Sequence, residues 1–357
     1  AYYDTRTEEQ QAQLENTEKL ETLSDWFSQS AALAVETHEH YLCGGTDCNG
    51  EGHGQEDKKT TFEPWTGSAT TTGGAYYLTR DISGFTVPSG VDLTLCLNGY
   101  NITSDGVQNE DVITIEPGAT FTLCDCKRGG TTDYGTIGHR RPDQYNGSGV
   151  TVENGTFNMY GGKIANNTVG YFTTNKSNGY GGGVLVFNKG IFNMIGGEIT
   201  GNRAKYGGGV SVGTAYGLHD NTAEDIGGTF NMTGGTISAN TASDRGGGVY
   251  MYKGTFTMNG GTISGNTASS SGGGVYVSGG TFTMANGSIT DNTATTYNGG
   301  GIYADYANLT ISGGSITGNT ASNGNGGGVY ADKGSFTMTG GTIGGTGTDD
   351  ANTAVNG

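Results

Sequence analysis

The stretch GTFNMTGGTISANTASDRGGGVYMYK (Gly228–Lys253) is followed at once by GTFTMNGGTISGNTASSSGGGVYVSG (Gly254–Gly279). A unit of about 26 residues recurs in this way, with insertions, from Gly155 to the C-terminus. A repeat of this length with several short apolar runs is typical of a solenoid, in which each unit packs only on its neighbours. A solenoid offers a long, regular surface, so binding along a polymer is the activity that we expect first.

Each unit contains three short runs, F-x-M, T-I-S and V-Y-V, separated by Gly-Gly, Gly-Asn-Thr-Ala and Gly-Gly-Gly. Apolar and polar residues alternate in every run, which is the pattern of a strand with one buried face. Glycine at the corners permits sharp turns. Three strands per coil, each stacked on its counterpart in the next coil, predict an all-β fold, a parallel β-helix. We expect it over residues 75–357, with irregular coils at 75–150 and regular repeats at 155–357.

Superposing the units predicts inward rows in which like side chains stack about 4.8 Å apart. The phenylalanine row is Phe157, Phe192, Phe230, Phe256, Phe282, Leu309 and Phe336, and parallel rows of Met, Ile and Val accompany it. A further row consists of Asn167, Asn202, Asn240, Asn266, Asn292 and Asn319. Stacked amides at a corner can hydrogen-bond one another and the turn backbone, so we interpret this row as structural.

The middle residue of each V-x-V strand should point outward. Four consecutive coils carry tyrosine there: Tyr250, Tyr276, Tyr303 and Tyr330. These rings predict an exposed strip about 15 Å long, on which sugar rings could stack, with polar contacts from Tyr252, Asp305 and Asp332. The alternative is that tyrosine simply suits an exposed strand and stabilises the ladder by stacking.

Two insertions interrupt the period, at Gly170–Tyr180 and Gly213–Gly227. In repeat arrays, insertions often form loops on the binding face. The aromatic residues that could wall a groove toward the tyrosine strip are Tyr171, Phe172, Tyr180 and Tyr216. Variable loops without a binding role are the alternative.

Residues 1–74 differ in composition from the repeats, and we expect them to cap the β-helix. The segment Thr7–Leu33 lacks Gly and Pro and predicts an amphipathic helix. Within HEHYLCGGTDCNGEGH, His38, His40, Cys43, Cys48 and His53 predict a structural zinc site. A Cys43–Cys48 disulfide is the alternative, and calcium stays open as the metal.

The remaining cysteines lie in the irregular coils. Cys96 in DLTLCLNG and Cys124 in TFTLCDC fall at matched positions, so they should lie on adjacent coils within disulfide range. Cys126 lies two residues farther along and competes for the same partner. Unbridged thiols are the alternative.

The formal net charge is −17, which makes nucleic acid, anionic membrane surfaces and polyanions such as pectate poor partners. A neutral polysaccharide remains as a suitable binding partner. The sequence has no apolar run long enough for membrane insertion and no signal peptide, so we interpret it as an excised domain or a mature extracellular chain, monomeric and covalently linked to further domains.

The motifs HEHYLCGGTDCNGEGH, FEPWTG, AYYLTRDI, LCLNGYNIT and FTLCDC, followed by GGTIxxN and GGGVYV units, resemble the secreted right-handed β-helix proteins of gut Firmicutes. The resemblance implies a right-handed β-helix and an extracellular location. Some proteins of this kind resemble carbohydrate-binding modules attached to xylanases, and others are called adhesins. The resemblance therefore implies a non-catalytic module that binds xylan-like plant-wall polysaccharide for an attached glycoside hydrolase; a surface adhesin is the main alternative.

The broader right-handed β-helix class also contains polysaccharide lyases and hydrolases. A hydrolase needs carboxylates that converge about 5–10 Å apart. Asp305 and Asp332 occupy matching positions on consecutive coils, but only Lys333 accompanies them. No dedicated acid–base set emerges, and we expect no catalysis.

Overall fold

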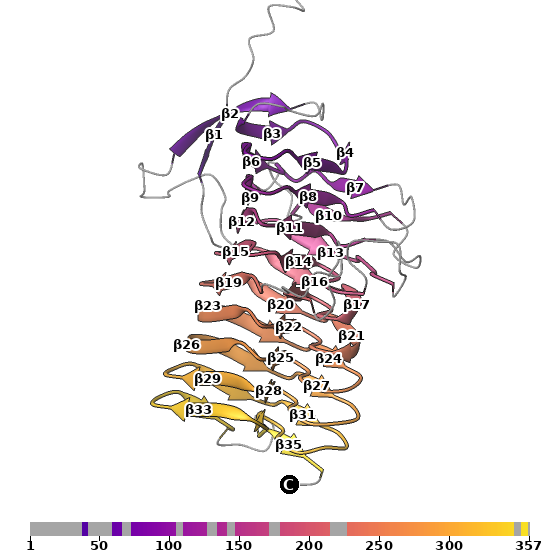
Figure 1. Ribbon diagram of the computed structural model, residues 1–357. Coiled ribbons are helices and arrows are strands. Elements are labelled where there is room, and N and C mark those ends of the chain that lie inside the picture. The colour runs from indigo at the N-terminus through magenta and orange to yellow at the C-terminus, as the bar shows by residue number, and fades with distance from the viewer. Residues whose placement is uncertain are drawn as a thin grey trace, which may run out of the picture. The chain divides into compact units, whose positions relative to one another are not determined.

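The computed structural model describes residues 38–41, 59–65, 73–104, 110–126, 134–140, 147–170, 179–214, 227–345 and 351–355 (Figure 1). The chain divides into two units, Ala1–His38 and Glu39–Gly357. The second unit is a parallel β-helix, which confirms the fold class expected from the repeats. The predicted helix at Thr7–Leu33 lies outside the described residues.

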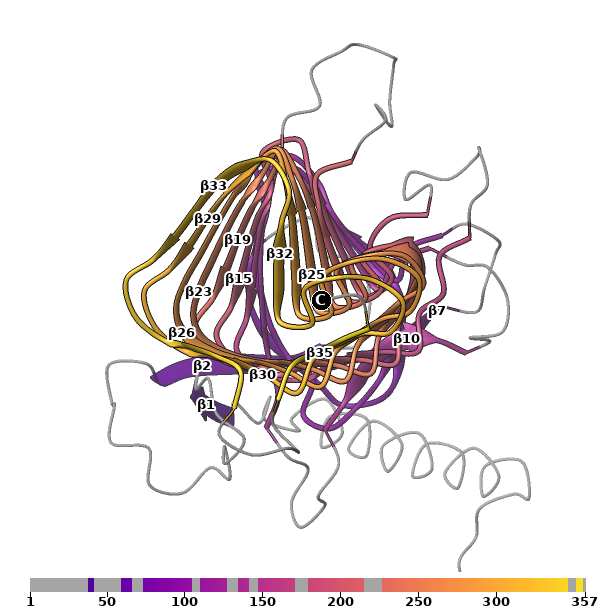
Figure 2. The same ribbon diagram turned by 90° about the horizontal axis from the view of Figure 1, so that it is seen from below.

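Each regular coil contributes strands to three sheets, and Figure 2 looks along the stack of coils. In the coil that begins at Gly228, β19 (Thr229–Met232) and β20 (Thr236–Ser238) belong to the wide sheet. The next strand, β21 (Thr241–Arg245), belongs to the T-A sheet, and β22 (Val249–Tyr252) belongs to the V-Y-V sheet. The T-A strand lies in the Gly-Asn-Thr-Ala segment, which was expected only as a connection.

Each of the three sheets contains further strands. The wide sheet also contains β1 (His38–Tyr41), β2 (Lys59–Trp65), β3 (Gly74–Leu78), β4 (Ile82–Ser83), β6 (Asp92–Cys96), β7 (Ile102–Ser104), β9 (Thr120–Cys124), β10 (Thr136–His139), β12 (Thr156–Met159), β13 (Lys163–Ala165), β15 (Ile191–Met194), β16 (Glu198–Thr200), β23 (Thr255–Ser264), β26 (Thr281–Thr290), β29 (Ala307–Ile311), β30 (Ser315–Thr317), β33 (Gly334–Met338) and β34 (Thr342–Ile343). The V-Y-V sheet also contains β5 (Phe85–Val87), β8 (Ile113–Ile115), β11 (Val150–Glu153), β14 (Val184–Phe187), β18 (Val210–Val212), β25 (Val275–Ser278), β28 (Ile302–Asp305) and β32 (Val329–Ala331). The T-A sheet also contains β17 (Arg203–Tyr206), β24 (Thr267–Ala268), β27 (Thr293–Ala294), β31 (Thr320–Ala321) and β35 (Thr353–Ala354). The pairings of β1 with β2 and of β2 with β3 extend the ladder ahead of residue 75.

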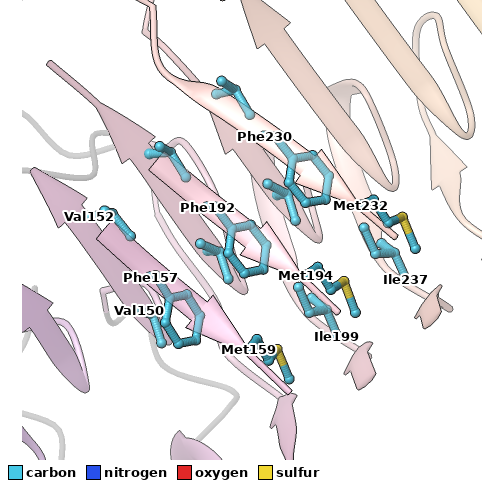
Figure 3. Close-up of a cluster of buried hydrophobic side chains, with 14 of the residues drawn as sticks. Val150, Val152, Phe157, Met159, Phe192, Met194, Ile199, Phe230, Met232 and Ile237 are labelled. Atoms are coloured by element: carbon cyan, nitrogen blue, oxygen red, sulfur yellow. The ribbon is translucent and has the colours of Figure 1, made fainter. Parts of the chain in front are cut away.

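The core consists of stacked rows of identical side chains, as the repeat predicts. Phe157, Phe192 and Phe230 are register partners on successive strands (Figure 3). Their ring centroids are 5.0 and 4.9 Å apart, and the rings are nearly parallel. All three side chains are fully buried. The spacing between coils therefore also sets the stacking distance of the aromatic core.

The asparagine row forms a continuous buried hydrogen-bond ladder at the corner between the wide sheet and the T-A sheet. The Asn240 Nδ2 atom donates to Asn266 Oδ1 at 3.0 Å, and the same oxygen accepts the backbone N–H of Asn240. The pattern repeats from Asn167 to Asn319, which confirms the structural interpretation of this row. Asn352 continues the ladder, since its Oδ1 accepts from Asn319.

A histidine closes the other end of this ladder. The His139 Nδ1 atom lies 2.8 Å from Asn167 Oδ1, and its Nε2 atom lies 2.9 Å from the backbone oxygen of Glu110. His139 is only 5% exposed. This histidine is therefore a buried structural member of the ladder.

Asp125 holds two turns together in the irregular coils. Its carboxylate accepts the backbone N–H of Gly99 at 2.8 Å and that of Gly135 at 2.6 Å. Burial raises the pKa of Asp125 to about 7 and outweighs the two hydrogen bonds, which lower it. Between about pH 4 and this value, the folded chain therefore binds a proton that the unfolded chain releases.

Because the folded pKa is raised, the contribution of Asp125 to stability should be complete below about pH 4 and should be lost progressively as the pH rises from there to about 7. Urea denaturation at about pH 5 and about pH 8 should show a loss of roughly 2 kcal/mol that Asp125→Asn abolishes. Asp92→Asn, at an exposed position, is the matched control and should keep the wild-type difference. Equal pH dependence in both variants would contradict the assignment.

Candidate functional site

The predicted tyrosine row exists and is in register. Tyr250 pairs with Tyr276, Tyr276 with Tyr303, and Tyr303 with Tyr330 across strands β22, β25, β28 and β32. Every second residue of these strands points away from the core, as the alternation predicts. The direction of the side chains was therefore predicted correctly.

The prediction that this row forms an exposed strip is wrong for its first half. Tyr250 and Tyr276 are each only 3% exposed. The chain that leaves the T-A sheet packs on them: the ring of Tyr206 lies 5.2 Å from that of Tyr250, and the Arg245 guanidinium lies 5.2 Å from the centroid of Tyr276. Burial accordingly raises the pKa of Tyr276 to about 12.

The faces of the rings are also occupied by one another. The ring centroids of Tyr250 and Tyr276 are 5.5 Å apart with an interplanar angle of 6°, and those of Tyr276 and Tyr303 are 5.0 Å apart at 4°. This is the geometry of the buried phenylalanine row. A sugar ring cannot stack on faces that already contact a neighbouring tyrosine, so the structure supports the alternative in which the row stabilises the ladder.

Only the last two tyrosines of the row reach solvent. Tyr303 and Tyr330 are partly exposed, and their ring centroids are 5.3 Å apart. Asp305 is partly exposed and Asp332 is exposed beside them. The pKa of Tyr303 is raised, first by burial and then by the negative charges of these two carboxylates. These residues form a small polar edge with two phenol hydroxyls and two carboxylates.

Two other residues of the predicted site contribute to packing. Tyr180 is 1% exposed, and its ring stacks on that of Tyr206 at 4.9 Å, so it does not wall a groove. Tyr252 is partly buried against the same aromatic cluster, and the Lys253 ammonium lies 5.1 Å from its ring centroid.

The other predicted residues fall outside the described side chains. The residues of the two insertions, Tyr171, Phe172 and Tyr216, belong to this group, as do Cys43, Cys48 and His53. Of His38 and His40 only the backbone is described, in β1. Among the side chains that the structure describes, no cluster of three or more His, Cys, Asp or Glu is arranged to hold a metal ion. The zinc site stays a prediction.

The wide sheet presents a different surface, which the sequence analysis did not single out. From β19 to β34, none of its described strands contains a charged residue, although the chain carries a net charge of −17. Its outward positions carry hydroxyl and amide groups. One row consists of Asn231, Thr257, Thr283, Thr310 and Thr337, and a second consists of Thr236, Thr262, Ser288, Ser315 and Thr342.

The spacing of this polar face is regular in two directions. Groups recur about every 4.8 Å from coil to coil and about every 6.7 Å along a strand. Some neighbouring groups bond each other, as in the contact of 2.8 Å from Asn231 Nδ2 to Asn193 Oδ1. In the earlier coils Lys163 and Glu198 lie on this face, 3.3 Å apart, so their charges compensate. From β19 to β34 the strands of this face offer hydrogen-bond donors and acceptors but no charge to an ionic ligand.

Comparison with known proteins adds no relative: no family model, no curated protein and no solved structure matches this chain. The fold alone defines its class, that of the parallel β-helix proteins. The described residues include no helix that is long and apolar enough to cross a membrane.

Proposed function

We propose that this chain is a non-catalytic extracellular module that binds a neutral polysaccharide, and that the uncharged outer face of the wide sheet is its binding surface. The observation that carries the proposal is the regular array of hydroxyl and amide side chains over five consecutive coils, without a charged residue in the strands from β19 to β34. A polymer of sugars carries hydroxyl groups at regular intervals and no charge, so it fits this chemistry.

The choice of polymer follows from two further considerations. The net charge of −17 disfavours polyanions. The resemblance of the sequence motifs to carbohydrate-binding modules attached to xylanases favours a xylan-like plant-wall polysaccharide and an attached glycoside hydrolase. The polar edge at Tyr303, Tyr330, Asp305 and Asp332 is a second place at which a sugar could bind.

Replacing three hydroxyls of the wide sheet should weaken binding without disturbing the fold. In the variant Thr257→Val, Thr283→Val, Thr310→Val, each side chain keeps its shape, and valine suits a strand. Each lost hydrogen bond is worth about 1 kcal/mol, so the dissociation constant for soluble xylan should rise at least about tenfold. Affinity gel electrophoresis measures the change, and added salt should not alter it because the ligand is uncharged.

The T-A sheet offers a matched control. The variant Thr267→Val, Thr293→Val, Thr320→Val makes the same change in the same coils on another sheet, and it should bind normally. If only Tyr303→Ala with Tyr330→Ala weakens binding, the polar edge is the site and the wide sheet is not. Absence of binding to every neutral polysaccharide would overturn the proposed function and favour an adhesin with a protein partner.

A further inference from the structure

The irregular coils contain a cluster of three cysteines on the outer face of the wide sheet. Cys96 of β6 and Cys124 of β9 are direct register partners in a parallel pair, and both side chains are buried, at 0% and 2% exposed. All three sulfurs, including that of the partly exposed Cys126, are in the thiol form. The Cys124 Sγ atom donates to the backbone oxygen of Leu95 at 3.7 Å, and the Cys96 thiol interacts with the side chains of Cys124 and Cys126.

We propose that Cys96 and Cys124 are a redox-active pair that closes to a disulfide linking two successive coils. Direct partners on neighbouring strands lie about 4.8 Å apart, inside the Cα–Cα range of about 4.4–6.8 Å that a disulfide tolerates. Both side chains leave the sheet on the same face, because they occupy the same register position. The bridge therefore requires rotation of the side chains and only a small approach of the two strands, since a disulfide holds its Cβ atoms about 3.5–4.5 Å apart.

Cys126 is not a register partner of Cys96. It lies two residues beyond Cys124, past the end of β9, so no strand pairing holds its Cα atom opposite that of Cys96. Its side chain also contacts that of Cys96. Only Cys124 is fixed opposite Cys96 by the pairing of two strands, so we expect the bridge to form there. Cys126 therefore stays a thiol when the other two cysteines are joined.

The reaction needs an external oxidant, and a small-molecule disulfide supplies it. The thiolate of one cysteine attacks the small disulfide and releases one small thiol. The second cysteine then attacks the mixed disulfide and releases the other small thiol. In total, two protein thiols lose two hydrogens and two electrons, and one small disulfide becomes two thiols.

The environment sets the rate of this exchange. Burial raises the pKa of Cys96 well above its ordinary value, and the hydrogen bond to Cys124 adds to the effect. For Cys124 the hydrogen bond from Cys96 lowers the pKa, but burial and nearby negative charge leave it raised. Because the thiolate is the attacking form, closure of the bridge should be slow at neutral pH and faster at alkaline pH.

Oxidised glutathione at alkaline pH, followed by alkylation and digestion before aspartate, tests the proposal on the intact chain. Each cysteine then lies in a separate peptide, since cleavage before Asp92, Asp111 and Asp125 divides them. We expect the peptide that contains Cys96 to be joined to the one that ends at Cys124, and Cys126 to be alkylated. A bridge from Cys126 to either residue, or three alkylated cysteines after prolonged oxidation, would overturn the proposal.

Variants separate this pair from the cysteines near the N-terminus. Cys126→Ser should still form the bridge, and its urea midpoint should rise on oxidation as in the wild type, because a crosslink restricts the unfolded chain. Cys124→Ser should show neither the crosslink nor the rise. An equal rise in Cys124→Ser would assign the stabilisation to Cys43 and Cys48 and would contradict the role proposed for Cys96.

Discussion

Replacing Asn266 with alanine should lower the free energy of unfolding by about 3 kcal/mol or more. The Asn266 side chain donates to Ile237 O at 2.9 Å and to Asn292 Oδ1 at 2.9 Å, and its own oxygen accepts two bonds from Asn240. The position is fully buried. Removal of the amide leaves buried donors and acceptors without partners, and each such group costs about 1–3 kcal/mol.

A matched control is available in the same coil. Asn259 is exposed in the middle of β23, so Asn259→Ala should change stability by less than about 0.5 kcal/mol. Urea denaturation monitored by circular dichroism measures both variants. Equal midpoints for the two would mean that water replaces the missing amide, and the ladder would then not be a main source of stability.

Replacing Tyr276 with alanine should cost about 3–5 kcal/mol, the range for removal of a buried aromatic side chain. Tyr276 is 3% exposed, stacks between Tyr250 and Tyr303, and lies under the Arg245 guanidinium. The interpretation of this row as an open platform predicts the opposite, because an outward side chain could be removed without loss of stability. Thermal or urea denaturation therefore decides between a packing role and an exposed binding role for the inner tyrosines.

Tyr330→Ala is the control for this prediction. Tyr330 is a tyrosine of the same row but is partly exposed, so its removal should lower the free energy of unfolding much less than the removal of Tyr276. Tyr276→Phe should also be tolerated, because the ring keeps its stacking contacts. Equal destabilisation by Tyr276→Ala and Tyr330→Ala would show that the packing of Arg245 and its neighbours on Tyr276 contributes little to stability.

Much of the fold could be predicted because the same pattern of apolar, polar and glycine residues recurs in several coils. Phe157, Phe192 and Phe230 were placed in one row from spacing alone, and the structure pairs them in register. The asparagine row was recognised for the same reason. The Thr-Ala strand was missed because its two-residue core is too short to show alternation. The buried role of His139 was not predicted because this residue does not recur in the repeat.

In the regular repeats, the sequence by itself determined the coil, the register of the apolar rows and the direction of the side chains in the strands that it revealed, because alternation within a strand and repetition between coils are local properties of the chain. Only the tertiary structure decided which outward side chains meet solvent. Tyr250 and Thr257 both point away from the core, yet Tyr250 is covered and Thr257 is partly exposed. The difference arises because Tyr206, from the preceding coil, packs on Tyr250. The alternation of residues predicts on which face of a sheet a side chain lies. Whether that side chain is buried depends on which other segment of the chain packs on it.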